Sequence, residues 1–188
     1  MKLHLLRHPQ PAVAPGLCYG ASDVPPDAAA LARVRAALTA ADLPGRLPVY
    51  ASPLQRCALL ARALRPAALH LDARLAEMDF GTWELRAWSG IARAEVDAWN
   101  ADLLHYRPGG GENVLDVARR VAAFRADLLR AHVPEALVIC HAGTIRLLLA
   151  LHAGRDLERA ALLAAQTPHR IGYGELLALD TDDGPKAL

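Results

Sequence analysis

Three short apolar segments, each followed by turn or polar residues, constrain the fold of this chain most strongly. They cover residues 3–6, 47–51 and 136–140. Apolar runs of this length are typical of buried β-strands when turn or helix signals bound them. Between them lie stretches rich in alanine and leucine with arginines at helical spacing, which predict helices over 27–43, 53–65, 113–132 and 144–153. Residues 175–180 are expected to add a final strand.

This alternation of strands and helices predicts an α/β fold. Helices long enough to cross from one strand to the next favour a mostly parallel sheet with helices on both faces. We therefore expect a three-layer α/β/α sandwich around that sheet. The length of 188 residues and the hydrophobic content of 53% suit one domain covering residues 1–188.

Composition excludes several classes of protein. Lys and Arg number 21 against 20 Asp and Glu, so the formal charge of +1 provides no overall field for nucleic acid or an anionic membrane. Cys18, Cys57 and Cys140 do not form the close pairs that zinc ribbons or redox dithiols require, which favours reduced thiols. The apolar start of the chain is too short for a signal peptide or a membrane span. We expect a cytoplasmic protein, with its oligomeric state open.

Residues 80–111 differ in composition from the rest of the chain. They contain all three tryptophans, Trp83, Trp88 and Trp99, and they end in Pro-Gly-Gly-Gly. This composition predicts a cap-like insertion over a site. Each tryptophan by itself fits packing between helices better than a platform for substrate, so none is taken as a site residue.

Polar clusters follow the three predicted strands. They are Arg7 with His8, residues 52–56 and residues 141–143. In a mostly parallel sheet, ligands bind beyond the carboxyl ends of the strands, so we expect these clusters to meet. Arginine suits a phosphate ester because its planar guanidinium meets two phosphate oxygens at once. A neutral imidazole can attack phosphorus when its other nitrogen is hydrogen-bonded, which makes His8 and His141 candidates.

Four sequence blocks carry a resemblance to a known family: LRH at 6–8, SPLQR at 52–56, LAEMDFGTWE at 75–84 and CHAG at 140–143. In this order and context they resemble the histidine phosphatase superfamily. The resemblance implies a phosphoglycerate mutase-like fold and phosphoester hydrolysis through a phosphohistidine, with no metal ion and no cofactor. It implies that His8 is the nucleophile and Glu77 the proton donor. It also implies that the phosphoryl oxygens are held and stabilised by Arg7, Arg56 and His141.

Within the superfamily, residues 9–25 are similar to the opening of α-ribazole phosphatases, above all in the pattern Gly-x-Cys-Tyr-Gly-x-Ser-Asp at 16–23. This similarity implies a small-molecule phosphate monoester as substrate, α-ribazole 5′-phosphate or the corresponding cobalamin phosphate, in cobalamin nucleotide-loop assembly. Tyr19 and Gly20 become secondary site candidates, because a ring can stack on a ligand and glycine permits a close turn. The chain departs from the common family pattern at Pro9 and Leu85, which stand where glycine is usual.

Other carboxylates compete with Glu77 for the role of proton donor. Asp79 and Glu84 lie in the same block, and the pattern Leu-x-Glu before Phe-Gly selects Glu77. Glu112 follows the glycine run in a Gly-Glu motif of the family, and it equally fits the first turn of a helix. Glu112 therefore stays a secondary candidate.

Rival interpretations of the whole site remain at this point. His4 and His8 stand four residues apart and suggest a metal site, but no cluster of carboxylates and histidines accompanies them. The enzymatic rivals are a phosphoglycerate mutase-type isomerase and a broad-specificity phosphatase. The rival outside enzymology is a catalytically silent binder of phosphorylated ligands.

Overall fold

The computed structural model describes residues 1–41, 43–44, 46–168 and 170–180. Its centre is a five-stranded sheet with the strand order β3-β2-β4-β1-β5. The strands are β1 (Lys2–Arg7), β2 (Val49–Ala51), β3 (Leu69–Leu71), β4 (Glu135–Cys140) and β5 (Leu176–Asp180). The first four are parallel, and β5 pairs antiparallel with β1. The predicted mostly parallel sheet is confirmed, and β3 is a strand that the sequence analysis did not predict.

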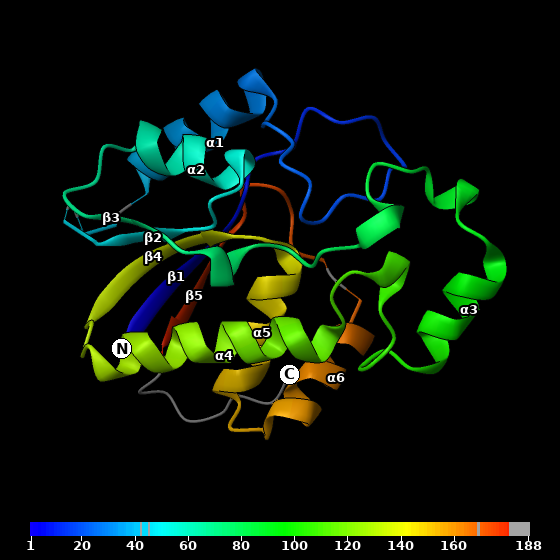
Figure 1. Cartoon of the computed structure of the whole chain (residues 1–188). Coiled ribbons are helices and arrows are strands. Elements are labelled where there is room, and N and C mark those ends of the chain that lie inside the picture. The colour runs from blue at the N-terminus through cyan, green and yellow to red at the C-terminus, as the bar shows by residue number, and fades with distance from the viewer. Residues whose placement is uncertain (42, 45, 169, 181–188) are drawn as a thin grey trace.

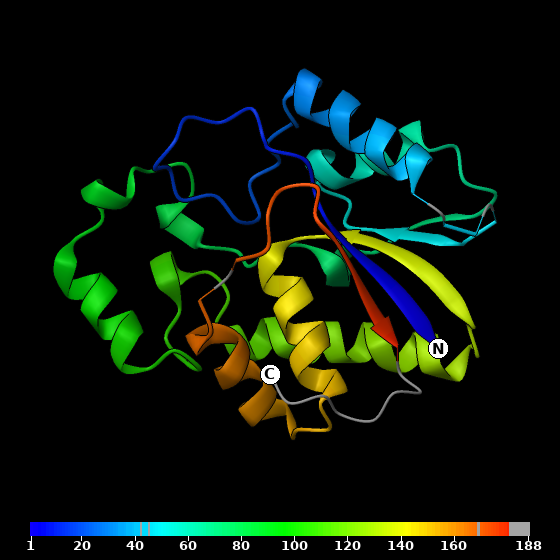
Figure 2. The ribbon, with the colours of Figure 1, turned by 180° about the vertical axis from the view of Figure 1, so that it is seen from behind.

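Helices cover both faces of the sheet (Figures 1 and 2). One face is covered by α1 (Ala28–Ala40) and α2 (Gln55–Ala63). The other is covered by α4 (Val114–Arg130), α5 (Ala142–His152) and α6 (Leu157–Gln166). The three-layer α/β/α sandwich is thus confirmed, while α6 was not among the predicted helices.

Side-chain caps determine where two of the predicted helices begin. Asp27 accepts a hydrogen bond from Ala30 N (2.8 Å), and Asn113 accepts one from Asp116 N (2.8 Å). Each side chain satisfies one of the N–H groups that the first helical turn leaves unpaired. The helices predicted from residues 27 and 113 therefore begin one residue later, because those two residues are the caps.

Alternation along the central strands divides the core between the two helical layers. Leu3 and Leu5 of β1 pack toward α4, α5 and α6, whereas Leu6 packs toward α1 and α2. In β4, Val138 and Ile139 divide in the same way, because successive strand residues point to opposite faces. All five side chains are fully buried, and each contributes about 1.5–3 kcal/mol of hydrophobic stabilisation. The central strands are therefore fixed from both sides.

Residues 80–111 lie to one side of the sheet, near the carboxyl ends of its parallel strands (Figure 1). They contain α3 (Arg93–Ala101) and the 3₁₀ turns η2 (Gly81–Trp83), η3 (Trp88–Gly90) and η4 (Pro108–Gly110). Trp83 is fully buried in a separate cluster with Cys18 and Ile91, and its Nε1 donates to Glu95 Oε2 (2.7 Å). This segment therefore has a small core of its own. The single-domain organisation stays a prediction.

The three cysteines are free and fully buried. Burial raises the pKa of the Cys18 thiol to about 12, and burial also raises the pKa values of the Cys57 and Cys140 thiols. The described part of the chain contains no helix long and apolar enough to cross a membrane.

Candidate active site

The carboxyl ends of β1, β2 and β4 bring the predicted polar clusters together. The parallel pairing continues one residue past the strands, where His8 N donates to Cys140 O (3.0 Å) and Ser52 N donates to Ile139 O (3.0 Å). His141 follows Cys140 directly and caps α5. The rings of His8 and His141 consequently lie side by side, with centroids 5.1 Å apart.

His8 is 3% exposed, and the backbone orients its ring. Nδ1 donates to the carbonyl oxygen of Pro9 (2.7 Å), which leaves Nε2 as the nitrogen with the lone pair. Burial, together with the positive charges of Arg56 and Arg7, lowers the pKa of His8 to about 3 against the opposing effect of that hydrogen bond. His8 is therefore a neutral imidazole at physiological pH. Proline at position 9 keeps the carbonyl on which this orientation depends.

His141 is 1% exposed, and both of its ring nitrogens have protein partners. Nδ1 accepts a hydrogen bond from Arg56 Nε (3.3 Å), and Nε2 lies 2.9 Å from Ser52 Oγ. Burial, followed by electrostatic interaction with His8 and with Arg56, lowers the pKa of His141 well below its usual range. His141 thus positions Arg56 through a hydrogen bond and does not itself line the cavity. Its contact with phosphoryl oxygens stays a prediction.

Two buried neutral histidines should make the folded protein sensitive to acid. An unfolded chain protonates its imidazoles near pH 6.5, whereas folded His8 stays neutral until the pH approaches 3. The unfolded state then binds more protons, so the free energy of unfolding falls as the pH falls from about 6.5 toward 3. We expect the urea midpoint to decrease over this window and His8→Asn to make the decrease shallower. His105→Ala, at an exposed histidine, is the control, and an unchanged slope in His8→Asn would contradict the neutral state of His8.

Arg56 is fully buried beside His8. Its Nη1 donates to Ser22 O (2.8 Å), and its Nη2 donates to Gly20 O. Among the described residues it forms no salt bridge with a carboxylate. A buried cation without a counter-charge is unfavourable unless an anion completes its surroundings. An anionic group in the cavity would balance the charge of Arg56, and its contact with phosphoryl oxygens stays a prediction.

Arg7 provides a second cation at the same end of the cavity. Its Nη1 donates to Ile171 O, its guanidinium lies 3.9 Å from the centre of the Tyr173 ring, and its buried Nε has no partner. No carboxylate in the part of the chain that the structure describes forms a salt bridge with it. Two guanidinium groups around one imidazole suit a doubly charged phosphoryl group.

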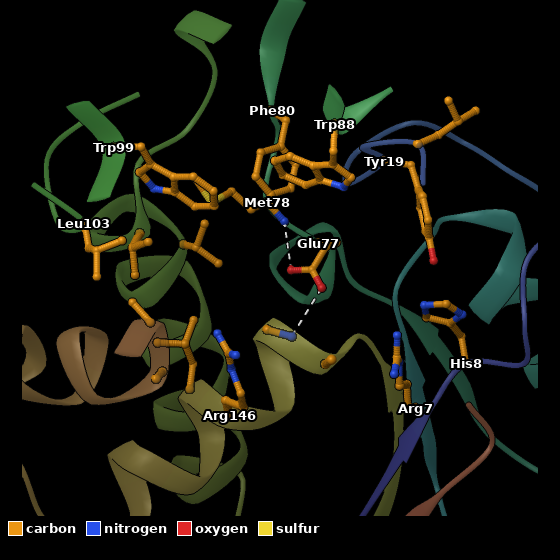
Figure 3. Close-up of a pocket in the computed structure, with 18 of the residues that line it drawn as sticks. Arg7, His8, Tyr19, Glu77, Met78, Phe80, Trp88, Trp99, Leu103 and Arg146 are labelled. Carbon is orange, nitrogen blue, oxygen red and sulfur yellow. Dashed lines mark hydrogen bonds between the residues drawn. The ribbon is translucent and has the colours of Figure 1, made fainter. Parts of the chain in front are cut away.

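Glu77 enters the same cavity from the loop that follows η1 (Ala73–Leu75). Its Oε1 accepts from Met78 N (3.1 Å) and its Oε2 accepts from Gly143 N (3.2 Å), as the dashed lines in Figure 3 show. A Cβ atom on Gly143 would lie 2.5 Å from Glu77 Oε1, so glycine leaves room for the carboxylate. Figure 3 shows the carboxylate pointing into the cavity between Arg146 and His8.

Glu84 competes with Glu77 for the acid role in the sequence, but its carboxylate binds the loop whose carbonyl groups accept from Arg56. Its carboxylate accepts from the backbone N–H groups of Gly20, Ala21 and Phe80, and from Ser22. Burial alone would raise the pKa of Glu84, but these hydrogen bonds hold it below its usual range. Glu84 does not line the cavity and instead fixes the loop that Arg56 contacts. The next residue, Leu85, has φ 60°, so it adopts the left-handed conformation that favours the glycine usual there.

Glu112 also lies outside the cavity wall. It binds Arg120 through both carboxylate oxygens (2.9 Å each) and accepts from Asp79 N (3.0 Å). Arg120 in turn donates to Glu77 O (3.2 Å). The pair of Glu112 and Arg120 therefore holds the loop on which Glu77 lies.

The two remaining candidates, Tyr19 and Gly20, differ in their positions. Tyr19 lines the cavity, whereas Gly20 does not. A Cβ atom on Gly20 would lie 1.9 Å from Met78 O, so this close approach of two backbone segments requires glycine. Gly20 serves the site through its carbonyl group, which accepts from Arg56.

Tyr173 is a site residue that the sequence analysis missed. Its ring centroid lies 5.5 Å from that of His8, and its hydroxyl lies 2.7 Å from the Tyr19 hydroxyl. The turn that carries it is tied to β1, because Gly174 N donates to Arg7 O (3.1 Å). Its sequence signal was an aromatic residue between two glycines before the last strand, which indicates a turn rather than a site.

The site opens into a cavity of about 610 Å³ (Figure 3). Its polar end is lined by Arg7, His8, Tyr19, Arg56 and Glu77. Much of the remaining wall is aromatic or aliphatic and includes Phe80, Trp88, Trp99, Leu103, Val117 and Leu147. Two of the tryptophans interpreted as packing residues therefore reach the cavity. No group of three or more His, Cys, Asp or Glu side chains among the described residues could hold a metal ion.

Known proteins resemble this chain in sequence and in fold. The model of the histidine phosphatase superfamily (branch 1) matches residues 3–172. The adenosylcobalamin/alpha-ribazole phosphatase of Escherichia coli (strain K12) is 32% identical over 117 residues, which are 58% of this chain and 58% of that protein. The chain spans less than two thirds of the length of the curated relatives that it matches.

Solved structures extend the likeness to nearly the whole chain. The alpha-ribazole phosphatase from Shigella flexneri has a TM-score of 0.82 and 28% identity, and the match covers 96% of this chain and 90% of that one. The mycobacterial glucosyl-3-phosphoglycerate phosphatase shares the fold with a TM-score of 0.77 at 24% identity, covering 95% of this chain and 89% of that one. With the family model matching 3–172, these findings assign the family: the chain belongs to the histidine phosphatase superfamily.

Proposed function

We propose that this protein hydrolyses phosphate monoesters through a covalent phosphohistidine on His8, with no metal ion and no cofactor. One observation carries the proposal. A neutral, buried imidazole with Nε2 free lies beside two arginines that lack a carboxylate partner among the described residues, and Glu77 lines the same cavity. A neutral nucleophile, fixed cations and a proton donor are the groups that phosphoryl transfer to nitrogen requires.

In the first step, Nε2 of His8 attacks phosphorus as the bond from phosphorus to the ester oxygen breaks. Protonated Glu77 gives its proton to the leaving oxygen, so that the alcohol departs neutral. Arg7 and Arg56 hold the non-bridging oxygens and stabilise their charge. His141 supports this step through its hydrogen bond to Arg56. A direct hydrogen bond from His141 to a phosphoryl oxygen, which the family resemblance implies, requires its ring to turn away from the present partners.

In the second step, water attacks the phosphorus of the phosphohistidine. The Glu77 carboxylate takes a proton from that water while the bond from phosphorus to Nε2 breaks. Inorganic phosphate leaves, His8 regains its lone pair and Glu77 is again protonated. One carboxyl group thus serves both steps in opposite protonation states.

We further propose α-ribazole 5′-phosphate, or the corresponding cobalamin 5′-phosphate, as the substrate. The similarity to two proteins named as α-ribazole phosphatases supports this choice. The aromatic part of the cavity, where the Trp88 and Trp99 rings are within 7° of parallel, suits a flat and mostly apolar base. Action on a small molecule in the cytoplasm belongs to the same proposal, and the three buried free thiols support that location.

The proposal is tested by phosphate release from α-ribazole 5′-phosphate, 3-phosphoglycerate and phenyl phosphate in the presence of a metal chelator. We expect the largest kcat/KM for α-ribazole 5′-phosphate. Comparable values for all three would leave a broad-specificity phosphatase, and interconversion of phosphoglycerates without phosphate release would indicate a mutase. Absence of turnover on every substrate would indicate a silent binder.

Glu77→Gln should slow hydrolysis according to the leaving group. An alkoxide needs a proton as it departs, whereas a phenolate leaves readily without one, so we expect kcat/KM to fall by roughly 10²–10³ for alkyl phosphates and far less for phenyl phosphate. The ratio kcat/KM is the informative quantity because it depends only on the steps up to and including the first irreversible one. Glu158→Gln, at an exposed residue of α6, is the matched control. An equal loss on alkyl and aryl phosphates would rule out the acid role.

A further inference from the structure

Arg146 is a third arginine of the cavity, and hydrolysis at His8 as described leaves it without a role. It lies on α5 three residues after Gly143 and points into the cavity (Figure 3). Its Nη1 donates to Thr167 O (2.9 Å), while its Nε is buried without a partner. Within the described ranges, no carboxylate forms a salt bridge with it.

Burial of the Arg146 guanidinium is energetically unfavourable unless a further acceptor binds it. Burial lowers the pKa of Arg146, and the charge of Glu77 acts in the opposite direction. A guanidinium has five N–H donors, of which the described protein acceptors use one here. Donors that lie in a partly desolvated wall are unfavourable unless a group in the cavity accepts them.

The position of Arg146 along the cavity indicates what that group is. Glu77 accepts from Gly143 in the first turn of α5, so the ester oxygen that receives the Glu77 proton lies near this turn. Residues three apart lie on one face of a helix, about 4.5 Å apart along its axis. The side chain of Arg146 therefore lines the part of the cavity where the leaving alcohol would lie, a few atoms beyond the ester oxygen that Glu77 protonates.

We propose that Arg146 determines specificity by donating hydrogen bonds to an oxygen of the leaving alcohol, a few atoms beyond the ester oxygen. This inference rests on the proposed hydrolysis at His8 but not on the choice of α-ribazole 5′-phosphate. In that substrate the acceptors are the ribose hydroxyls, and in a phosphorylated hydroxy acid the acceptor is the carboxylate. Both present oxygen lone pairs at the required position.

Two matched substrate pairs test this proposal. The first pair is α-ribazole 5′-phosphate and its 2′,3′-dideoxy analogue. The second is 3-phosphoglycerate and 1,2-propanediol 1-phosphate, in which a methyl group replaces the carboxylate. We expect the wild type to prefer the oxygen-bearing member of one pair by roughly tenfold or more in kcat/KM, the effect of a charged hydrogen bond. Arg146→Met keeps the apolar stem and should abolish that preference, whereas Arg62→Met, on the exposed side of α2, should not.

The ratio within each pair separates recognition from structure, because a merely structural role for Arg146 would lower both members equally. An unchanged ratio in Arg146→Met would overturn the inference and leave the hydrolysis intact. If Arg146→Met loses the preference in the second pair alone, Arg146 recognises a carboxylate of the substrate, and the α-ribazole assignment is overturned. If Arg146→Met does not fold, Arg146→Gln, which keeps two donors, should retain part of the preference. If no substrate turns over, the dissociation constants of the two members of each pair are compared instead.

Discussion

Replacement of His8 by alanine is expected to lower kcat/KM for every phosphate monoester by about 10⁴-fold or more, because among the described residues that line the cavity His8 is the only histidine. Nε2 is the nitrogen left free when Nδ1 donates to Pro9, and burial keeps it unprotonated. The two arginines remain in the variant, so binding of inorganic phosphate should persist while turnover is lost. Steady-state phosphate release and phosphate titration measure the two quantities.

A chemical trap gives this prediction a second readout. Denaturing the wild type during turnover at alkaline pH should preserve an acid-labile phosphoryl group on His8, and peptide mapping should locate it. His105→Ala, at an exposed histidine of the insertion, should trap the same adduct at the wild-type level. An adduct on another residue, or substantial turnover by His8→Ala, would exclude the phosphohistidine mechanism proposed for this site.

Replacement of Arg56 by methionine should damage catalysis and folding together. Loss of its charge at the phosphoryl group is expected to lower kcat/KM by roughly 10²–10³, the effect of removing a preorganised donor. The carbonyl groups of Gly20 and Ser22 and Nδ1 of His141 also lose a donor, at a cost of about 1–3 kcal/mol for each group left unsatisfied in the buried site. Denaturant unfolding and kcat/KM on one preparation measure both effects.

The same helix supplies the control for Arg56→Met. Arg62 lies on α2 and is exposed, so Arg62→Met should change neither the free energy of unfolding nor kcat/KM by more than the error of measurement. Arg56→Lys should recover little, because a single ammonium group cannot replace the planar guanidinium that donates to two carbonyl groups and, in the proposed mechanism, to a phosphoryl oxygen. Full stability in Arg56→Met would contradict its role in holding the loop of residues 20–22.

The part of the site that follows the strands was predictable from the sequence. Arg7 ends β1 and His8 follows it, and His141 follows β4, so a parallel sheet brings them to one edge whatever the details of packing. Arg56 lies within the first turn of α2, directly after β2, and arrives by the same route. Their mutual proximity follows from topology alone.

Other parts of the site depend on tertiary contacts that no local pattern encodes. Local sequence does not distinguish the roles of Glu77, Glu84 and Glu112. Their hydrogen-bond partners in the folded chain show that Glu77 lies in the cavity and that Glu84 and Glu112 hold loops. Tyr173 reaches His8 across 165 positions of the chain because β5 returns beside β1. Arg146 had a weak signal, its spacing of three from Gly143 on a helix, but its place in the cavity wall and its hydrogen bond to Thr167 O required coordinates.

Secondary structure was missed where packing overrides local signals. The strand β3 has three residues, Leu69–Leu71, of which the last two are exposed, so it lacks the apolar run that identified the other parallel strands. The alanine-rich helix α6 has too few large apolar residues for a clear pattern, and it is fixed by small side chains packed on α4 and α5. Both elements are set by what lies beside them.

The three buried thiols give the protein built-in reporters of local opening. Cys18 lies in the small core of the insertion, Cys57 in the layer of α1 and α2, and Cys140 at the end of the central strand β4. Alkylating reagents attack thiolates, so each cysteine is labelled only when its surroundings open to solvent. The three labelling rates at graded denaturant therefore distinguish fluctuations of the insertion, of one helical layer and of the sheet, and for each variant they show which of these has loosened.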